Sequence, residues 1–290
     1  MAINWFPGHM AKTRREIKEN LKLVDAVIEM RDARAVRSSA NPEIDELCEL
    51  KPRIILLNKK DLAETAITKQ WIDSLSTENI KVIPVNCLNG DGLKNIKKVL
   101  NELLFEKHER KRNKGISNII DRVMVVGIPN VGKSSFINKL ANSSIARIGD
   151  KPGVTKSRQW IKTKLGIELM DTPGILWPRL ENNEVQYDLA FTGAIKDEVM
   201  DIETLALKLI AKLQEIQPER LSARYKIGTL SEDPLENMDM IGKKRGAIIS
   251  GGEIDYNRIA VMLLDEFRGG KLGPISLEKP IITLEKKDEK

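Results

Sequence analysis

A glycine-rich segment holds the residues with the clearest chemistry in this chain. It runs from Gly127 to Ser134, follows the apolar run Arg122–Gly127 and opens a predicted helix. In such a loop the main-chain N–H groups point at phosphate oxygens, and the helix N-terminus favours the anion. Lys133 would reach the β- and γ-phosphates, and the Ser134 hydroxyl would ligate Mg²⁺. The segment predicts a nucleoside triphosphate site; the alternative is a glycine-rich helix start that binds no nucleotide. The residues expected around the phosphates are Pro129, Asn130, Val131, Gly132, Lys133, Ser134 and Ser135.

A second motif, Asn58-Lys59-Lys60-Asp61, ends another apolar run and would read the base. The two oxygens of the Asp61 carboxylate match the paired N–H donors at N1 and N2 of guanine. Adenine lacks this pair, and sites of this kind reject such an analogue by on the order of 10⁴-fold. Asn58 is expected at O6 and N7, and the stem of Lys59 would cover the base. An exposed polar turn is the alternative interpretation.

Three further segments complete the predicted site. Asn86 and Cys87 end the next apolar run, and their backbone N–H groups are expected near the guanine O6. Asp171 would hold the Mg²⁺ shell through water, and the N–H of Gly174 would sense the γ-phosphate. Thr155 is the predicted second hydroxyl ligand of Mg²⁺. The segment around it, 145–158, would become ordered when the γ-phosphate is present.

The base motif precedes the phosphate loop, which is the reverse of the usual order. The same nucleotide site has therefore been cut and rejoined, as in a circular permutation. One consequence is that the chain runs from Gly174 through Pro178 almost directly into the next domain. The nucleotide state could bias the orientation of that domain through this short covalent link.

Short apolar runs alternate with stretches of helical spacing, which predicts a mostly parallel six-stranded sheet with helices on both faces. The predicted strands are Leu23–Met30, Arg53–Leu57, Lys81–Asn86 and Arg122–Gly127, with a hairpin from Gln159–Leu165 and Ile167–Met170. The predicted helices are Pro42–Leu50, Ile67–Ser76 and Leu93–Leu104, the last capped by Asp91. The charged run Phe105–Asn118 is predicted to be a solvated linker, with an RNA contact as the alternative.

The later part of the chain predicts a separate helical domain. Its helices are expected at Tyr187–Asp201, Glu203–Gln217 and Tyr256–Phe267. We predict a GTPase domain over 1–180, a helical RNA-binding domain over 181–280 and a charged tail over 281–290. Lys243-Lys244-Arg245, Arg268 and Lys271 are candidate contacts for RNA phosphates, and an ordinary solvated face is the alternative.

Composition sets looser limits on function. Lys and Arg number 48 against 42 Asp and Glu, a net charge of +6 that is compatible with a polyanionic partner. Two cysteines, Cys48 and Cys87, and two histidines, His9 and His108, are too few for a zinc or disulfide framework. The opening residues do not have the pattern of a signal peptide, and no apolar run has membrane-spanning length. The cytoplasm is the expected location.

The motifs NKKD, VNC, GIPNVGKS, PGVT and DTPG together resemble those of the circularly permuted GTPases of translation and ribosome assembly. The opening Trp5–Met10, the triplet Asp32-Ala33-Arg34 and the closing Phe267–Leu277 extend the resemblance nearly end to end. Ala35-Val36 departs from the Ile-Pro pair usual in relatives. The resemblance implies a factor for late maturation of the bacterial large ribosomal subunit. It also implies contact with ribosomal RNA and hydrolysis stimulated by the particle.

Hydrolysis would need a substitute for a missing glutamine. The position that orients the attacking water in familiar GTPases is Ile175, so we expect low intrinsic turnover. Asn130 matches the position that ligates K⁺ in cation-dependent relatives; an asparagine that caps its own backbone is the alternative. His9 could orient or deprotonate water, as the resemblance suggests, or be an inert surface histidine.

Three functions stay open at this point. The first is a GTP-hydrolysing assembly factor that acts on large-subunit precursors and ribosomal RNA, a monomer off the ribosome with no membrane or DNA partner. The second is a GTP-gated RNA scaffold whose hydrolysis only times release. The third is a signalling GTPase with a protein partner. The base motif argues against an ATPase.

Overall fold

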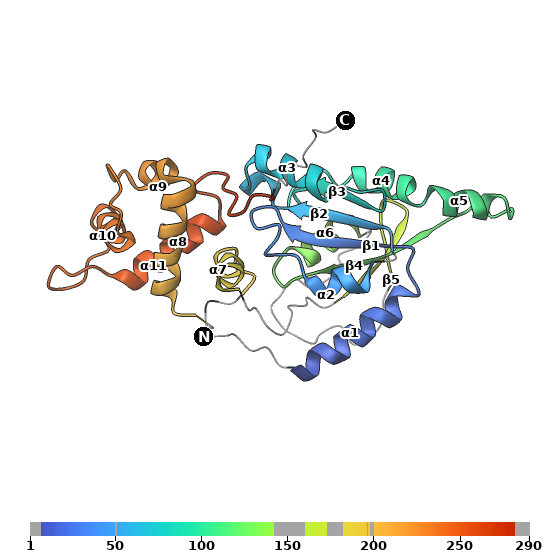
Figure 1. The fold of residues 1–290 in the computed structure, drawn as a ribbon, viewed down its shortest axis with the longest axis horizontal. Helices are drawn as coiled ribbons and strands as arrows, with labels where there is room; N and C mark the ends of the chain where they lie inside the picture. Colours follow the sequence, from blue (N-terminus) through green and yellow to red (C-terminus); the bar gives the residue numbers. More distant parts are fainter. Residues whose placement is uncertain are drawn as a thin grey trace, which may run out of the picture.

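The computed structural model describes residues 7–49, 51–141, 160–172, 182–195, 197 and 200–281, the first seven of these by their backbone alone. A sheet with its helices, here called the sheet domain, is followed by five helices, here called the helical domain (Figure 1). The predicted domain boundary at residue 180 falls in 173–181, outside the described residues.

The sheet has six strands in the order β3-β2-β1-β4-β6-β5. Its strands are β1 (Ala26–Asp32), β2 (Arg53–Asn58), β3 (Ile80–Pro84), β4 (Asp121–Gly127), β5 (Trp160–Lys162) and β6 (Ile167–Asp171). Among these strands, only β5 and β6 pair in antiparallel fashion. The predicted fold class, including the antiparallel edge and the helical domain that follows, is confirmed.

Helices cover both faces of the sheet because successive residues of each buried strand point to opposite faces. Ile28 on β1 packs with helices α4 and α6, whereas its neighbour Val27 packs with α1 and α2. Trp71 of α3 covers the same face as Val27, farther along the sheet. The helices of this domain are α1 (Pro7–Leu21), α2 (Pro42–Leu47), α3 (Thr65–Leu75), α4 (Asn95–Leu103), α5 (Phe105–Arg112) and α6 (Lys133–Leu140), with a 3₁₀ turn η1 (Lys60–Leu62).

Two predictions for this domain were wrong. The run Phe105–Asn118 is not a simple solvated linker, since α5 forms there. His108 of α5 is buried, and its Nε2 lies 2.7 Å from Oδ1 of Asp121, which anchors the helix to β4. Asp91 does not cap α4, which begins after Lys94 without a side-chain cap. The Asp91 carboxylate instead pairs with Lys60 Nζ at 2.6 Å.

The helical domain contains α7 (Asn183–Phe191), α8 (Ile202–Ile216), α9 (Pro218–Tyr225), α10 (Pro234–Arg245) and α11 (Tyr256–Arg268). Asn182, Asp201, Asp233 and Asp255 each cap the helix that follows with a side-chain oxygen. The predicted helix Tyr187–Asp201 was too long, because Gly193 with φ of +78° breaks it after α7. None of the described helices is long and apolar enough to cross a membrane.

Near the end of the described chain, residues 272–278 return from α11 to the sheet domain (Figure 1) and are here called the C-terminal strap. The backbone N–H of Ile275 donates to the carbonyl of Leu62 at 2.9 Å, and that of Leu277 donates to Arg34 at 2.8 Å. These bonds attach the helical domain beside the turn that follows the base motif.

A buried acidic pair lies where the strap meets α7. The Glu278 carboxylate accepts hydrogen bonds from the backbone N–H of Arg37 at 2.7 Å and from Ser38 N–H at 3.0 Å, and it also accepts the Ser38 hydroxyl. Oδ2 of Asp188 lies 3.3 Å from the same hydroxyl. Burial, together with the charge of Glu278, raises the pKa of Asp188 to about 7, against an opposing effect of Lys212.

We predict that Asp188→Asn stabilises the protein at pH 8. The raised pKa means that the folded state holds a proton that the unfolded chain releases, so stability falls as pH rises from about 4 to about 7. Asparagine removes this loss. The change in the free energy of unfolding caused by the substitution should therefore be about 1–3 kcal/mol more favourable at pH 8 than at pH 5. Urea unfolding at both pH values measures the difference. Glu219→Gln at an exposed position of α9 is the control, and an Asp188→Asn effect that does not change with pH would contradict the prediction.

Candidate nucleotide site

The carboxyl ends of four parallel strands bring the predicted motifs to one edge of the sheet. β1 ends at Asp32, β2 at Asn58, β4 at Gly127 and β6 at Asp171. In open parallel sheets, ligands bind outside these ends. Here β1 lies between β2 and β4, so the base motif and the phosphate loop approach each other although they are far apart in sequence.

Asn58 connects the two motifs directly. Its side chain is buried; Nδ2 donates to the carbonyl of Val131 at 2.8 Å, and Oδ1 accepts the N–H of Cys87 at 3.0 Å. One amide therefore joins the base motif, the phosphate loop and the loop after β3. The second N–H of Nδ2 is left for N7 of a base, and that predicted role stays a prediction.

Two glycines make this close approach possible. A Cβ on Gly132, where φ is +106°, would lie 2.3 Å from Nδ2 of Asn58. A Cβ on Gly127 would lie 2.7 Å from the backbone oxygen of Met30. Both positions exclude a side chain, so the glycines of the motif are needed to pack the loop as well as to expose its N–H groups.

The side chain of Lys133 packs against the phosphate loop, and its predicted contact with the β- and γ-phosphates stays a prediction. Its Nζ donates to the carbonyls of Gly127 at 2.9 Å and Ile128 at 2.6 Å. Burial lowers the pKa of Lys133 to about 8, and the nearby Asp171 carboxylate opposes the shift. Burial likewise raises the pKa of Asp171, against an opposing effect of Lys133. A phosphate anion beside this ammonium would offset the cost of its burial.

The donors at this edge fit Mg²⁺. Ser134 carries a hydroxyl in the first turn of α6, and Asp171 ends β6 with a carboxylate, both hard oxygen ligands of the kind that Mg²⁺ prefers. No group of three or more His, Cys, Asp or Glu side chains that could hold a metal occurs in the described part of the chain. Phosphate oxygens and water would supply the other ligands of Mg²⁺ at such a site.

The base motif forms a tight turn at the end of β2. Lys59 has φ of +60°, an uncommon conformation for a residue with a side chain, and its Nζ pairs with Asp32 Oδ2 at 2.9 Å. Asp61 in η1 is exposed, which leaves its carboxylate accessible to a ligand. Lys60 points to Asp91.

The structure does not support the predicted contact of two backbone N–H groups with the guanine O6. The N–H of Asn86 donates to the carbonyl of Asp91 at 3.0 Å, and that of Cys87 donates to Asn58. The Asn86 side chain accepts the N–H of Leu88 at 2.9 Å, which shapes this loop. Both expected donors are thus already used within the protein.

Comparison with known proteins agrees with this geometry. The family model described as 50S ribosome-binding GTPase matches residues 122–234, which include the phosphate loop but leave the base motif outside and ahead of it. Ribosome biogenesis GTPase A of Bacillus cereus is 48% identical over 97% of this chain and 95% of its own length. The chain belongs to the ribosome biogenesis GTPase A family. Mitochondrial ribosome-associated GTPase 1 of Bos taurus is 33% identical over 96% of this chain and 89% of that protein.

Solved structures give the same result for the fold. The crystal structure of GNP-bound YlqF from T. maritima aligns with a TM-score of 0.61 and 29% identity over 93% of this chain and 99% of that one. The GDP-bound form of that protein aligns with a TM-score of 0.60, 28% identity and coverage of 92% and 99%. This GTPase therefore has the family's permuted GTPase fold, as the order of its motifs predicted, and binds guanine nucleotides.

Asn130 has a role that the sequence did not indicate. Its Nδ2 donates to the carbonyl of Gly193 at 3.0 Å, so the phosphate loop is bonded to the helical domain. Its φ of +56° lies in the left-handed region, which asparagine tolerates better than most residues. Its side-chain nitrogen therefore bonds to the helical domain and does not cap the backbone of the phosphate loop.

Several predicted site residues lie outside the described residues. They are Thr155, Gly174, Ile175, the segment 145–158 and the side chain of His9, whose backbone belongs to α1. Pro129 and Ser135 lie in the described phosphate loop and at the start of α6.

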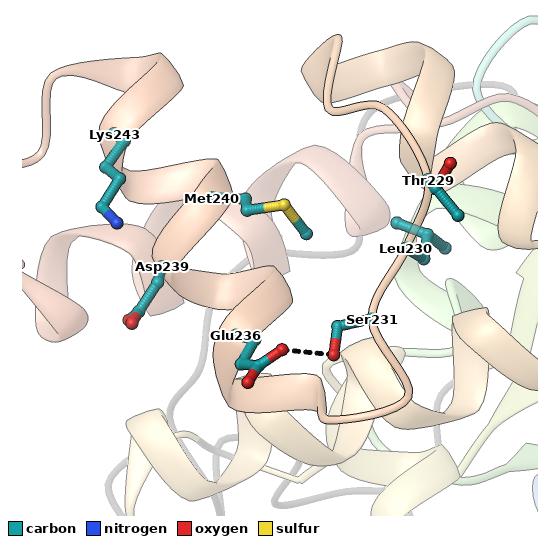
Figure 2. Close-up of a pocket in the computed structure, with 7 residues that line it drawn as sticks. All are labelled: Thr229, Leu230, Ser231, Glu236, Asp239, Met240 and Lys243. Atoms are coloured by element: carbon teal, nitrogen blue, oxygen red, sulfur yellow. Dashed lines mark hydrogen bonds between the residues drawn. The ribbon is translucent and has the colours of Figure 1, made fainter.

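A pocket of about 310 Å³ on the helical domain is a separate feature (Figure 2). It lies between α10 and the segment before it. The carboxylates of Glu236 and Asp239 line it beside Lys243, and Glu236 bonds to Ser231. Two carboxylates make it unsuitable for a triphosphate.

The predicted RNA contacts differ in how accessible they are. Arg268 pairs with Asp197 at 2.6 Å and also donates to carbonyls of α7, so it holds the helical domain together. The guanidinium of Arg245 lies 5.1 Å from the ring centre of Tyr225. Lys243, Lys244 and Lys271 are exposed.

We predict that Gly132→Ala weakens GDP binding by at least about 100-fold, because its Cβ would displace the Asn58 amide. Calorimetric titration with GDP measures the loss. Gly166→Ala is the matched control: it has a similar backbone, with φ of +70°, but its Cβ would meet nothing within 4 Å. The control should lose only about 1 kcal/mol of stability and keep its affinity. Equal effects of the two substitutions on binding would contradict the prediction.

Proposed function

We propose that this GTPase acts in late assembly of the large ribosomal subunit, binding its precursor in the GTP state and leaving after hydrolysis. The observation that carries the proposal is the likeness to ribosome biogenesis GTPase A, which covers 97% of the chain and so includes the helical domain as well as the nucleotide site. The matched family description, 50S ribosome-binding GTPase, points to the same partner. The site of action would be the cytoplasm, with the protein a monomer between rounds.

The contact between Asn130 and Gly193 supports a switching role. This bond joins the helical domain to the loop that would bind the phosphates, and GTP and GDP differ in their number of phosphates. A change at the loop can therefore favour one orientation of the helical domain over another, provided that the two nucleotides contact the loop differently. The affinity for the particle would follow that orientation.

Ribosomal RNA is the proposed ligand of the helical domain. Lys243 and Lys244 are exposed in the last turn of α10, and Lys271 follows α11. The aromatic fraction of the chain is only 4%, which favours contacts to the backbone of structured RNA over base stacking. Such contacts release counterions, so binding should weaken steeply with salt.

Hydrolysis would use Mg²⁺ held by Ser134, Asp171 and Thr155 together with phosphate oxygens. The metal would neutralise charge that develops on the transferred phosphoryl group. Lys133 would bind the β- and γ-phosphates, and Gly174 would sense the latter. Because Ile175 cannot orient water through a side-chain hydrogen bond, a group from outside this loop has to do so. We propose His9, on α1, for that role once the particle is bound.

We predict that large subunits stimulate GTP hydrolysis by this protein, and that His9→Ala loses most of the stimulation while GTP binding is unchanged. Phosphate release with and without subunits measures the first effect, and nucleotide titration the second. Co-sedimentation with immature and mature subunits in GDP, GTP and a non-hydrolysable analogue completes the test.

The outcomes separate the alternatives. Equal hydrolysis with and without subunits would contradict a particle-triggered enzyme. Hydrolysis-deficient variants that still promote assembly would favour a GTP-gated scaffold. Binding that does not respond to salt would favour a signalling GTPase with a protein partner.

We also predict faster hydrolysis in KCl than in NaCl at matched ionic strength. The bond from Nδ2 of Asn130 to Gly193 leaves Oδ1 of the same amide for a monovalent cation, which could offset charge between the β- and γ-phosphates. Asn130→Ala should lower the ratio of the hydrolysis rates in KCl and NaCl by at least about fivefold. Equal rates in the two salts would refute the role.

A further inference from the structure

Asp32 lies at the end of β1 with both carboxylate oxygens engaged. Oδ1 accepts the backbone N–H and Nε of Arg34 at 3.0 and 2.9 Å, and Oδ2 accepts Nη2 of Arg34 at 2.9 Å. Oδ2 is also 2.9 Å from Nζ of Lys59 in the base motif. The residue is only 3% exposed, so these charge-assisted bonds are shielded from water.

The bond to Lys59 fixes a side chain that would otherwise be mobile. A lysine stem has several rotatable bonds, and its ammonium normally prefers water. Here the ammonium is held at Asp32, and the left-handed backbone of Lys59 sets where the stem begins. With both ends fixed, the stem loses little further freedom when a base packs against it.

The ionisation of Asp32 is secured by its partners. Burial raises the pKa of Asp32, but the charges of Arg34 and Lys59 outweigh it and hold the pKa well below its usual value. The carboxylate therefore stays charged throughout the neutral range.

Arg34 extends the same cluster to the helical domain. Its guanidinium carbon lies 5.3 Å from the ring centre of Phe267, at the end of α11. Its carbonyl accepts the N–H of Leu277 in the C-terminal strap at 2.8 Å. Arg34 is 1% exposed, so both contacts are buried. A cation over an aromatic face is attractive, more so when it is removed from water.

We propose that Asp32 is a positioning residue shared by the guanine site and the helical domain. It holds the stem of Lys59 for the base and holds Arg34 against Phe267, so guanine binding and docking of the helical domain strengthen each other. The inference rests on the proposed contact of Lys59 with the base. Coupling of this kind is reciprocal, so docking of the helical domain must alter nucleotide affinity by the same factor by which nucleotide alters docking.

This base-side joint differs from the contact between Asn130 and Gly193. Guanine is common to GTP and GDP, so the joint at Asp32 is engaged with either nucleotide. The phosphate-side contact adjoins the part of the ligand that hydrolysis changes. The helical domain would therefore pivot about the joint at Asp32 as the phosphate-side contact changes.

A double-mutant cycle tests the first half of the proposal. Asp32→Asn keeps the shape of the side chain and removes its charge, and Lys59→Met keeps the stem and removes the ammonium. GDP affinity, measured by titration of each folded variant, should fall about tenfold for Asp32→Asn and for Lys59→Met. The double variant should lose clearly less than the product of the two single losses, because much of the effect of Asp32 on GDP affinity would act through that ammonium.

Two results would overturn this half. One is a normal GDP affinity in Asp32→Asn; the other is a double variant whose loss is the product of the two single losses. A further variant, Lys59→Ala, tests the base contact itself. If Lys59→Ala binds GDP normally, the proposed base site is wrong; if it is impaired while Asp32→Asn is not, only the positioning role fails.

Phe267→Leu tests the second half. It removes the aromatic face from Arg34 but leaves an apolar side chain in the core. GDP affinity should fall about threefold although Phe267 belongs to the helical domain. Ile210→Val in the buried core of α8 is the control for a general loss of stability and should bind GDP normally. Normal affinity in Phe267→Leu, or an equal loss in both variants, would overturn the coupling.

Discussion

The nucleotide site depends on the buried amide of Asn58. In a permuted chain, the base motif and the phosphate loop lie on separate stretches of sequence, so their relative position has to be fixed by tertiary contacts. Asn58 supplies such a contact by donating to Val131 and accepting from Cys87. A buried amide whose partners are lost costs about 1–3 kcal/mol for each unsatisfied group, so this arrangement is strongly preferred over its alternatives. Gly132 has no side chain because the amide occupies that space. The spacing between base and phosphate recognition is thereby set before any ligand arrives.

The helical domain borders this site on two sides. The C-terminal strap and Arg34 attach it next to the base motif, and Asn130 attaches it to the phosphate loop through Gly193. A domain held at both ends of a nucleotide site can respond to the ligand without a long relay of contacts. The buried pair of Asp188 and Glu278 adds a titratable group at the same boundary. The contact of Asn130 with Gly193 and this titratable pair therefore both lie where the helical domain meets the sheet domain.

The sequence predicted the parts of this structure that have local signatures. Apolar runs with glycine-rich or polar ends identified the parallel strands, and the motifs at those ends identified the ligand. It did not predict α5, because the contact of buried His108 with Asp121 that anchors this highly charged helix is a tertiary one. The same limit applies to the site: Asn58 was expected to face the base, but its bonds to Val131 and Cys87 depend on the meeting of three loops. Asp32 and Arg34 belong to a motif that the sequence shows. The contact of Arg34 with the ring of Phe267 could not be predicted, because it exists only when the helical domain is in place.

Recognition of guanine by the exposed carboxylate of Asp61, beside the amide of Asn58 that joins the two motifs, is the proposal on which this nucleotide site rests. Its most direct test is the affinity of the wild-type protein and of Asp61→Asn for guanosine, xanthosine and adenosine triphosphates. We expect the wild type to prefer GTP over ATP by on the order of 10⁴-fold and Asp61→Asn to shift the preference toward the xanthine nucleotide. Equal affinity of the wild type for GTP and ATP, or an unchanged guanine preference in the variant, would contradict it.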